Sequence, residues 1–117
     1  IQLFTLHSPS PRTHELWKRR NLTFYQFVDQ IKLLTDEKVI LVGDFNLSNY
    51  SSRIEQFTRG ISGDFIGSWP NLSYLPAYFT LAIDHVFISD SSNTCSRERV
   101  NSLDYSDHYP ILTKIYL

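Results

Sequence analysis

The feature that most constrains the fold is a short aliphatic run that ends in two polar side chains. Residues 39–42 read Val-Ile-Leu-Val and lead directly into Gly43, Asp44, Phe45 and Asn46. An uninterrupted aliphatic run of this kind indicates a strand that is covered on both faces. In an extended chain, residues two apart point the same way, so Asp44 and Asn46 can face one site while Phe45 turns back into the core. The run therefore predicts a buried strand whose end reaches a functional site.

A strand and a helix are expected before this run. Residues 1–7 alternate well enough to form a strand, and the prolines of the Ser-Pro-Ser-Pro segment that follows stop it. A helix is predicted to begin near Ser10 or Thr13 and to end at residues 35–38. Strand, helix and strand in this order indicate a right-handed crossover unit. The apolar stripe expected on the helix consists of Leu16, Phe24, Phe27, Val28, Ile31 and Leu34.

One short helix and three strands are expected after the run. The helix is predicted at residues 51–59, with Gly60 as its C-terminal stop. Residues 63–78 are rich in Gly, Pro, Ser and aromatic side chains, which indicates an irregular loop. No repeat or linker interrupts the chain, so it is one domain or part of one. The strands are predicted at 81–89, 97–103 and 109–117, with a turn at 90–96.

Composition limits the possible functions. The 11 basic and 12 acidic residues give a net charge of −1, which argues against tight, charge-driven binding to duplex nucleic acid. The single cysteine, Cys95, cannot form an intrachain disulfide, and in a Ser/Asn-rich loop it is more readily explained as incidental than as catalytic. No apolar run approaches the roughly 18 residues of a membrane span. The sequence lacks methionine and opens inside a strand pattern, so we expect it to be a fragment.

Four stretches place chemically competent side chains beside aliphatic strand residues. Carboxylate and carbonyl oxygens are the ligands that Mg²⁺ prefers, and histidine can hold a phosphate oxygen or transfer a proton near neutral pH. Together these residue types suit metal-assisted attack of water on a phosphoester. The sequence has no Cys/His zinc pattern, no phosphate-binding GxxxxGK[ST] loop and no GxSxG motif. The stretches contain His7, Asp44 with Asn46, Asp84 with His85, and Asp107 with His108. Because they lie at strand ends, we expect all of them except His85 to cluster at one edge of a single sheet.

Each of these side chains also has a structural explanation. Asp-x-Asn and Asp-His beside Pro are common turn formers, because Asp and Asn bond their own backbone. Asp84 lies in an apolar strand, where an unpaired charge is costly, so a buried salt bridge would also explain it. His7 could be a satisfied strand-end histidine, and His85, which should point away from Asp84, is more readily explained as structural. A solvated helix face explains one basic cluster better than phosphate contact does, namely Arg12, Lys18, Arg19 and Arg20.

Taken together and in this order, the stretches resemble the endonuclease/exonuclease/phosphatase superfamily. Residues 39–46 (VILVGDFN), 83–89 (IDHVFIS) and 106–112 (SDHYPIL) match its three C-terminal motifs in sequence and order. The LHSPSP stretch is similar to the histidine-bearing strand end of its deoxyribonuclease branch. WKRRN and GSWP look like a bacterial branch whose members often carry N-terminal membrane helices. The resemblance covers essentially residues 1–117 and implies an α+β fold, the C-terminal half of a single four-layer α/β/β/α sandwich domain with one mixed β-sheet flanked by helices.

The resemblance implies a role for each polar residue. Asp44 would position or deprotonate the attacking water, and Asn46 would orient that water or the phosphate. Asp107, together with Asp44, would approach a bound Mg²⁺ or Mn²⁺ ion. His108 would contact the phosphate, with Asp84 bonded to its other ring nitrogen. The second phosphate-contacting histidine would be His7.

The function implied is a metal-dependent phosphoester hydrolase, either a phosphodiesterase, a nuclease or a phosphatase, seen as its C-terminal half. The family also has an Asn and a metal-binding Glu on strands that would precede Ile1, and this chain has neither motif. The alternative is a non-catalytic binding module or an inactive fragment of the same fold.

Substrate and partners follow from the same resemblance. Nucleic acid, a phospholipid head group and a small phosphoester stay open as substrates. The expected partner is the N-terminal half of the same domain, or a second copy, covering the open face of the sheet. The cellular compartment is open, and the parent protein could be anchored by N-terminal membrane helices.

Overall fold

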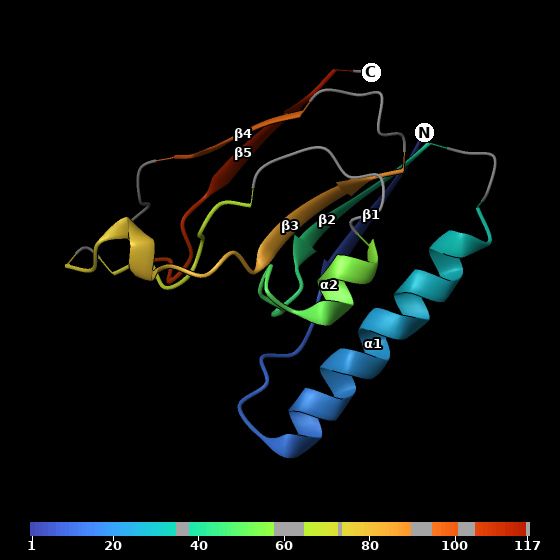
Figure 1. The fold of residues 1–117 in the computed structure, drawn as a ribbon, viewed down its shortest axis with the longest axis horizontal. Coiled ribbons are helices and arrows are strands. Elements are labelled where there is room, and N and C mark those ends of the chain that lie inside the picture. Colours follow the sequence, from blue (N-terminus) through green and yellow to red (C-terminus); the bar gives the residue numbers. More distant parts are fainter. Residues whose placement is uncertain (35–37, 58–64, 73, 90–94, 101–104, 117) are drawn as a thin grey trace.

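The computed structural model describes residues 1–34, 38–57, 65–72, 74–89, 95–100 and 105–116 (Figure 1). They form a three-stranded mixed sheet, a separate two-stranded antiparallel sheet and two α-helices. The α+β class and the mixed sheet predicted from the sequence are confirmed. The elements in chain order are β1 (Gln2–His7), α1 (His14–Lys32), β2 (Val39–Asp44), α2 (Ser52–Phe57), the 3₁₀ helix η1 (Ala77–Phe79), β3 (Asp84–Ile88), β4 (Cys95–Arg99) and β5 (Ile111–Ile115).

The mixed sheet brings three polar strand ends to one edge. β1 and β2 run parallel, joined through α1, in a register that places His7 opposite Asp44. β3 runs antiparallel to β2 and pairs Asp84 with the same Asp44. The last residues of β1 and β2 and the first residue of β3 therefore lie side by side, and all three side chains share one face of the sheet.

The opposite face of the sheet forms the core with α1. Phe24 of the helix packs with Leu41 and Phe87 of the sheet, and Phe45 lies among them with no exposed surface. Figure 1 shows α1 running along this face, with the short helix α2 alongside its middle turns. Because Phe45 points into the core, the chain that follows β2 is anchored directly beside Asp44. Burial of these rings thus holds the strand end at which the polar residues lie.

Helix α1 begins where its cap predicts and ends earlier than expected. Thr13 is the N-cap, and its side chain accepts a hydrogen bond from the Leu16 N–H at 3.2 Å. The helix ends at Lys32 with Leu33 as C-cap, before the predicted residues 35–38, of which 35–37 lie outside the described residues. No helix in the described part of the chain is long and apolar enough to cross a bilayer.

The second half of the chain departs from the predicted boundaries. β3 begins at Asp84 and not at residue 81, because Leu81 forms an antiparallel bridge with Trp69 outside the sheet. β4 begins at Cys95, so the prediction that this cysteine lies in a turn is wrong. Residues 101–103 of the predicted strand, like residues 58–60 after α2, lie outside the described residues.

The face of the mixed sheet that does not contact α1 is only partly covered by the described residues. Val39 and Leu41 are buried, as predicted, but Ile40 and Val42 on this face are half-buried. Leu3, which pairs with Ile40, has 64% of its surface exposed. A cavity of about 550 Å³ separates Val42 and Val86 of this sheet from residues of β5. The expectation of a strand covered on both faces is therefore met on one face only.

Candidate active site

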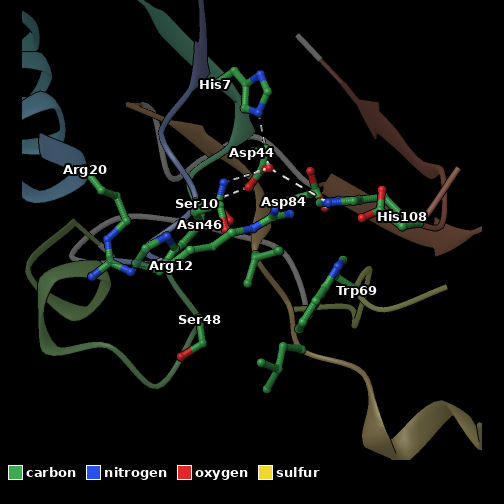
Figure 2. A pocket seen from close by; sticks show the side chains of 14 residues that line it. His7, Ser10, Arg12, Arg20, Asp44, Asn46, Ser48, Trp69, Asp84 and His108 are labelled. Atoms are coloured by element: carbon green, nitrogen blue, oxygen red, sulfur yellow. Dashed lines mark hydrogen bonds and ion pairs between the residues drawn. The ribbon is translucent and has the colours of Figure 1, made fainter. Parts of the chain in front are cut away.

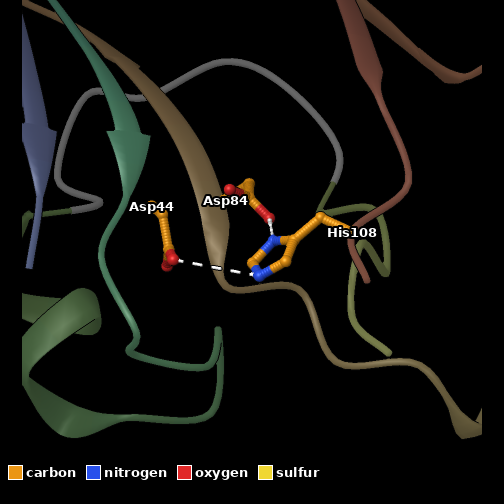
Figure 3. A group of neighbouring side chains, drawn as sticks. All are labelled: Asp44, Asp84 and His108. Carbon is orange, nitrogen blue, oxygen red and sulfur yellow. Dashed lines mark hydrogen bonds and ion pairs between the residues drawn. The ribbon is translucent and has the colours of Figure 1, made fainter. Parts of the chain in front are cut away.

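A short polar contact at this sheet edge joins Asp84 to His108. His108 precedes β5, and its Nδ1 lies 2.8 Å from Asp84 Oδ2 (Figure 3). A carboxylate can only accept a hydrogen bond, so Nδ1 carries the proton and donates. The other ring nitrogen, Nε2, points toward Asp44 and lies 3.9 Å from its Oδ2. The predicted bond between Asp84 and His108 is confirmed, and it leaves Nε2 directed toward the pocket.

Asp44 lies at the centre of the polar cluster. Its Oδ2 is 3.7 Å from Nε2 of His7, a side chain that is 84% exposed at the end of β1 (Figure 2). Burial raises the pKa of Asp44, and repulsion from Asp84 raises it further. A hydrogen bond from the Asn46 backbone and the nearby His108 and His7 act in the opposite direction. The site thus holds two carboxylates close enough for the charge of Asp84 to raise the pKa of Asp44.

Asn46 is held against Asp44 by a turn. Its φ of 48° is left-handed, a conformation that Asn tolerates better than most residues. The Asn46 N–H donates to Asp44 Oδ1 at 2.8 Å, and its Nδ2 donates to Asp44 Oδ2 at 3.0 Å and to the Ser8 carbonyl at 2.8 Å. The prediction that both side chains face one site is therefore met, but by this turn and not by strand alternation. The turn-former explanation and the functional one both apply to Asp44 and Asn46.

All six predicted site residues line one cavity of about 820 Å³. Three come from the edge of the mixed sheet, whereas Asp107 and His108 lie just before β5 of the second sheet, so the expectation that one sheet carries them all is wrong. Asp107 is exposed at the rim, and its role as a metal ligand stays a prediction. Within the described residues, one group could hold a metal ion, with ligand atoms within 4.8 Å of one another: Asp44, Asp84 and His108.

Two residues that support the site were not predicted. Arg20 is only 7% exposed, so its assignment to a solvated helix face is wrong. Its Nη1 donates to the Asn46 carbonyl at 2.8 Å, and burial lowers its pKa. Ser8 is buried and donates from Oγ to the Phe45 carbonyl at 2.6 Å. Spacing could have revealed Arg20, which lies four residues before the buried Phe24 on the same helix face. No signal in the sequence marks Ser8.

Arg12 and Trp69 also line the cavity. Figure 2 places Arg12 and Arg20 on one side and Trp69 on the side nearer His108. Trp69 and Leu81, which face each other across their bridge, both reach this cavity and are each partly exposed. The cavity therefore has cationic and apolar walls on either side of the carboxylates.

His85 takes no part in this cavity. It is 1% exposed, its Nε2 lies 2.7 Å from the Leu47 carbonyl, and its ring packs against Phe45 and Phe87. Burial lowers its pKa to about 4, so the ring is neutral at pH 7 and donates from Nε2. This confirms the prediction that His85 is structural.

Comparison with known proteins agrees with this geometry. The sequence profile of the Endonuclease/Exonuclease/phosphatase family matches residues 4–108. Comparison with the curated proteins gives no match. Among solved structures, a mannosyl-6-phosphatase from Bacteroides thetaiotaomicron is 20% identical, with a TM-score of 0.72 over 98% of this chain and 51% of its own.

Two further structures share the fold. A Staphylococcus aureus beta toxin mutant with bound magnesium ions is 18% identical, with a TM-score of 0.68 over 95% of this chain and 51% of its own. Sphingomyelinase C from Streptomyces griseocarneus is 19% identical, with a TM-score of 0.58 over 95% of this chain and 51% of its own. This chain thus spans about half the length of these three structures. Because the family profile covers most of its length, the chain belongs to the endonuclease/exonuclease/phosphatase family.

Proposed function

We propose that the protein is a phosphoester hydrolase that uses a divalent metal, and that this chain supplies one half of its active site. The observation that carries the proposal is the Asp84–His108 pair, whose free Nε2 is directed toward Asp44 across one cavity. Family membership supports the reaction class, since the related structures include a phosphatase and a sphingomyelinase. We also propose that residues 1–117 are the C-terminal portion of a single domain.

His108 would contact the phosphate through Nε2. Asp84 fixes the ring tautomer, because it accepts the Nδ1 proton, and it would stabilise the positive charge if Nε2 takes up or shares a proton. An imidazole oriented in this way can donate to a phosphoryl oxygen as negative charge develops on it. His7, exposed at the end of β1, would contact the phosphate from the other side of Asp44.

Asp44 would position the attacking water, and Asn46 would hold Asp44 in place. The two hydrogen bonds from Asn46 satisfy both carboxylate oxygens from one side and leave their other lone pairs toward the cavity. Arg20 and Ser8 support this arrangement indirectly, since they bind the carbonyls of the turn that carries Asn46. Proximity of a held water and a held phosphate is a large part of the rate enhancement in such sites.

The donor set fits a hard divalent cation. Asp44 and Asp84 repel each other, and an ion such as Mg²⁺ or Mn²⁺ beside Asp44 would relieve that repulsion. We expect Asp44 to bind the ion and Asp107, at the rim, to approach it. When bound, the ion would act as a Lewis acid and lower the pKa of its water. A further ligand, the family's Glu, would come from outside this chain.

We further propose that the rest of the domain covers the open face that carries Leu3. Leu3 is exposed there, and the cavity between this sheet and β5 lies on the same face. At about 25 cal/mol per Å² of apolar surface, leaving such a face in water would cost many kcal/mol. Light scattering with intact-mass analysis tests this. A lone, monodisperse, cooperatively unfolding 13.7 kDa monomer would show that no cover, neither the missing half nor a second copy, is needed.

The experiment that tests the function is a phosphoester screen on the full-length protein. The panel contains nucleic acid, a phospholipid with a phosphodiester head group and small sugar phosphates, each with Mg²⁺, with Mn²⁺ and with EDTA. We expect turnover of at least one class, abolished by EDTA and reduced at least about 100-fold by Asp44→Asn. The exposed Gln26→Glu on α1 serves as control. Turnover that persists in EDTA would overturn the metal dependence, and no turnover of any class would favour a non-catalytic module.

A further inference from the structure

A short segment outside the sheets, residues 68–71, bonds to Asp84 and to the residues on either side of His108. Toward β3, the Ser68 N–H donates to the Leu81 carbonyl at 2.9 Å, and the Leu81 N–H donates to the Trp69 carbonyl at 2.6 Å. Ser68 has no exposed surface, and its Oγ lies 3.4 Å from the backbone nitrogen of Asp84. Residues 68 and 69 are thereby attached to the chain that leads into Asp84.

The same segment holds the turn that carries His108. The Tyr109 N–H donates to the Ser68 carbonyl, and the Asn71 N–H donates to the Asp107 carbonyl, each at 2.7 Å. The Asn71 side chain donates from Nδ2 to the Ser106 carbonyl at 2.9 Å. These three bonds attach residues on both sides of His108, and they fix the backbone from which its ring projects.

This connection matters because the two partners come from different sheets. Asp84 begins β3, which pairs with β2, whereas His108 precedes β5, which pairs with β4. No ladder among the described strands therefore sets the distance between the Asp84 carboxylate and the His108 ring. Residues 68–71 bind the backbone on both sides and act as a spacer of fixed length.

We propose that Asn71 is a positioning residue that keeps His108 Nδ1 on Asp84. Asn71 does not line the cavity, so it acts through His108 and not on the substrate. Its amide is the one side-chain donor among the three bonds to the turn, which makes it the part that substitution can remove. The catalytic part of this inference rests on the proposed function, but the geometric part does not.

The kinetic test removes the Nδ2 donor in two ways. Asn71→Ala deletes the side chain, and Asn71→Asp keeps its shape but adds a charge, so agreement between the two separates the lost bond from the added charge. In the full-length protein we expect kcat to fall about tenfold with KM within about twofold, as for a displaced reacting group. In a His108→Ala background the same changes should lower kcat no further. An equal fall in that background would overturn the proposal.

A second readout needs no activity. The ring ¹⁵N spectrum of the histidines reports which nitrogen of His108 carries the proton, with Asp84→Ala marking the unpaired state. We expect Asn71→Ala and Asn71→Asp to shift the His108 signals toward those of Asp84→Ala, while the exposed Gln26→Glu leaves them unchanged. Wild-type His108 signals in both Asn71 variants would overturn the inference. If neither the wild type nor any variant turns over a phosphoester, the proposed function is overturned, whereas the geometric inference about Asn71 stands.

Discussion

His85 and His108 are both neighbours of Asp84, one along the chain and one in space. His85 follows Asp84 in β3, yet its ring lies on the core face, bonded to the Leu47 carbonyl among aromatic rings. His108 is 24 residues away in sequence and binds the Asp84 carboxylate directly. Strand alternation separates the first pair, and the folding of a second sheet brings the second pair together. The surroundings of each ring, and not its place in a motif, decide which histidine can do chemistry.

The largest effect is expected at His108. Replacing it with Ala in the full-length protein should lower kcat/KM about 10³-fold, because the ring proposed to contact the phosphate is lost. The His108 ring and its partner Asp84 are each 27% exposed, so water can replace the lost bond and the free energy of unfolding should fall by only about 1 kcal/mol. Steady-state kinetics and a denaturant titration measure the two quantities. His14→Ala, on the exposed start of α1, is the matched control and should retain wild-type values of both.

His85 should govern stability against acid. Its pKa is about 4 in the folded chain against an ordinary value of 6.5, so the unfolded chain takes up the proton first. The contribution is therefore intact above pH 6.5 and is lost as pH falls toward 4. At ~1.36 kcal/mol per pKa unit the loss approaches about 3 kcal/mol. Denaturant titrations across this window measure it.

The control for this pH effect is His85→Gln, which keeps a donor toward the Leu47 carbonyl but cannot titrate. Its stability should depend less on pH between 6.5 and 4 than that of the wild type. Identical pH dependence in both proteins would show that His85 is not the group responsible. The raised pKa of Asp44 stabilises the folded chain as pH falls, which is opposite in sign to the contribution of His85. Asp44 is present in both the wild type and His85→Gln, so it does not affect their comparison.

Asp84→Asn should separate binding from turnover. The amide keeps the size of the carboxylate but removes the charge that stabilises the protonated His108 ring. We expect kcat to fall on the order of 10²-fold with a much smaller change in KM, because the charge acts mainly in the transition state. Kinetics at saturating substrate measure this. Turnover equal to wild type there would count against a catalytic role for the pair.

The smallest effect is expected from Ser8→Ala. The Ser8 hydroxyl donates to the buried Phe45 carbonyl at 2.6 Å, and its loss leaves that carbonyl without this donor. Thermal or denaturant unfolding should show that the free energy of unfolding falls by about 1–2 kcal/mol. The control is Ser10→Ala, because Ser10 lies two residues further along the chain and its side chain is less buried. Equal losses of unfolding free energy at both positions would mean that the hydrogen bond to the Phe45 carbonyl does not contribute measurably to stability.

Much of this site could be predicted from the sequence, because its polar residues lie at or near the ends of apolar strands. The crossover unit and the aliphatic run at residues 39–42 determine where His7 and Asp44 lie, and both were found in this way. The prediction for Arg20 was wrong because it relied on the charge of the side chain and not on its helical spacing. Burial of the guanidinium is offset by its hydrogen bonds to the Asn46 carbonyl and to the Asn21 side-chain oxygen. The left-handed turn at Asn46 and the hydrogen bonds of Ser8 depend on tertiary contacts, which no local pattern reports.

The division of the strands into two separate sheets could not be predicted from local sequence patterns either. The strands near residues 95 and 111 were recognised approximately, but pairing partners are set by packing between distant segments. The same holds for residues 68–71, whose irregular composition conceals the bonds that connect β3 with the turn before β5. Loop segments that support a site through backbone hydrogen bonds are hard to recognise from the sequence, because almost any residue type can form such bonds.

In the proposed reaction, Asp44 and His108 act together on one phosphorus centre. A double-mutant cycle on kcat/KM, with Asp44→Asn, His108→Ala and both together in the full-length protein with Mg²⁺, tests it most directly. Groups that act as one unit are strongly non-additive. We therefore predict that the double variant is about as active as the weaker of the two single variants. Losses that multiply independently, or a double variant that retains wild-type activity, would contradict the claim.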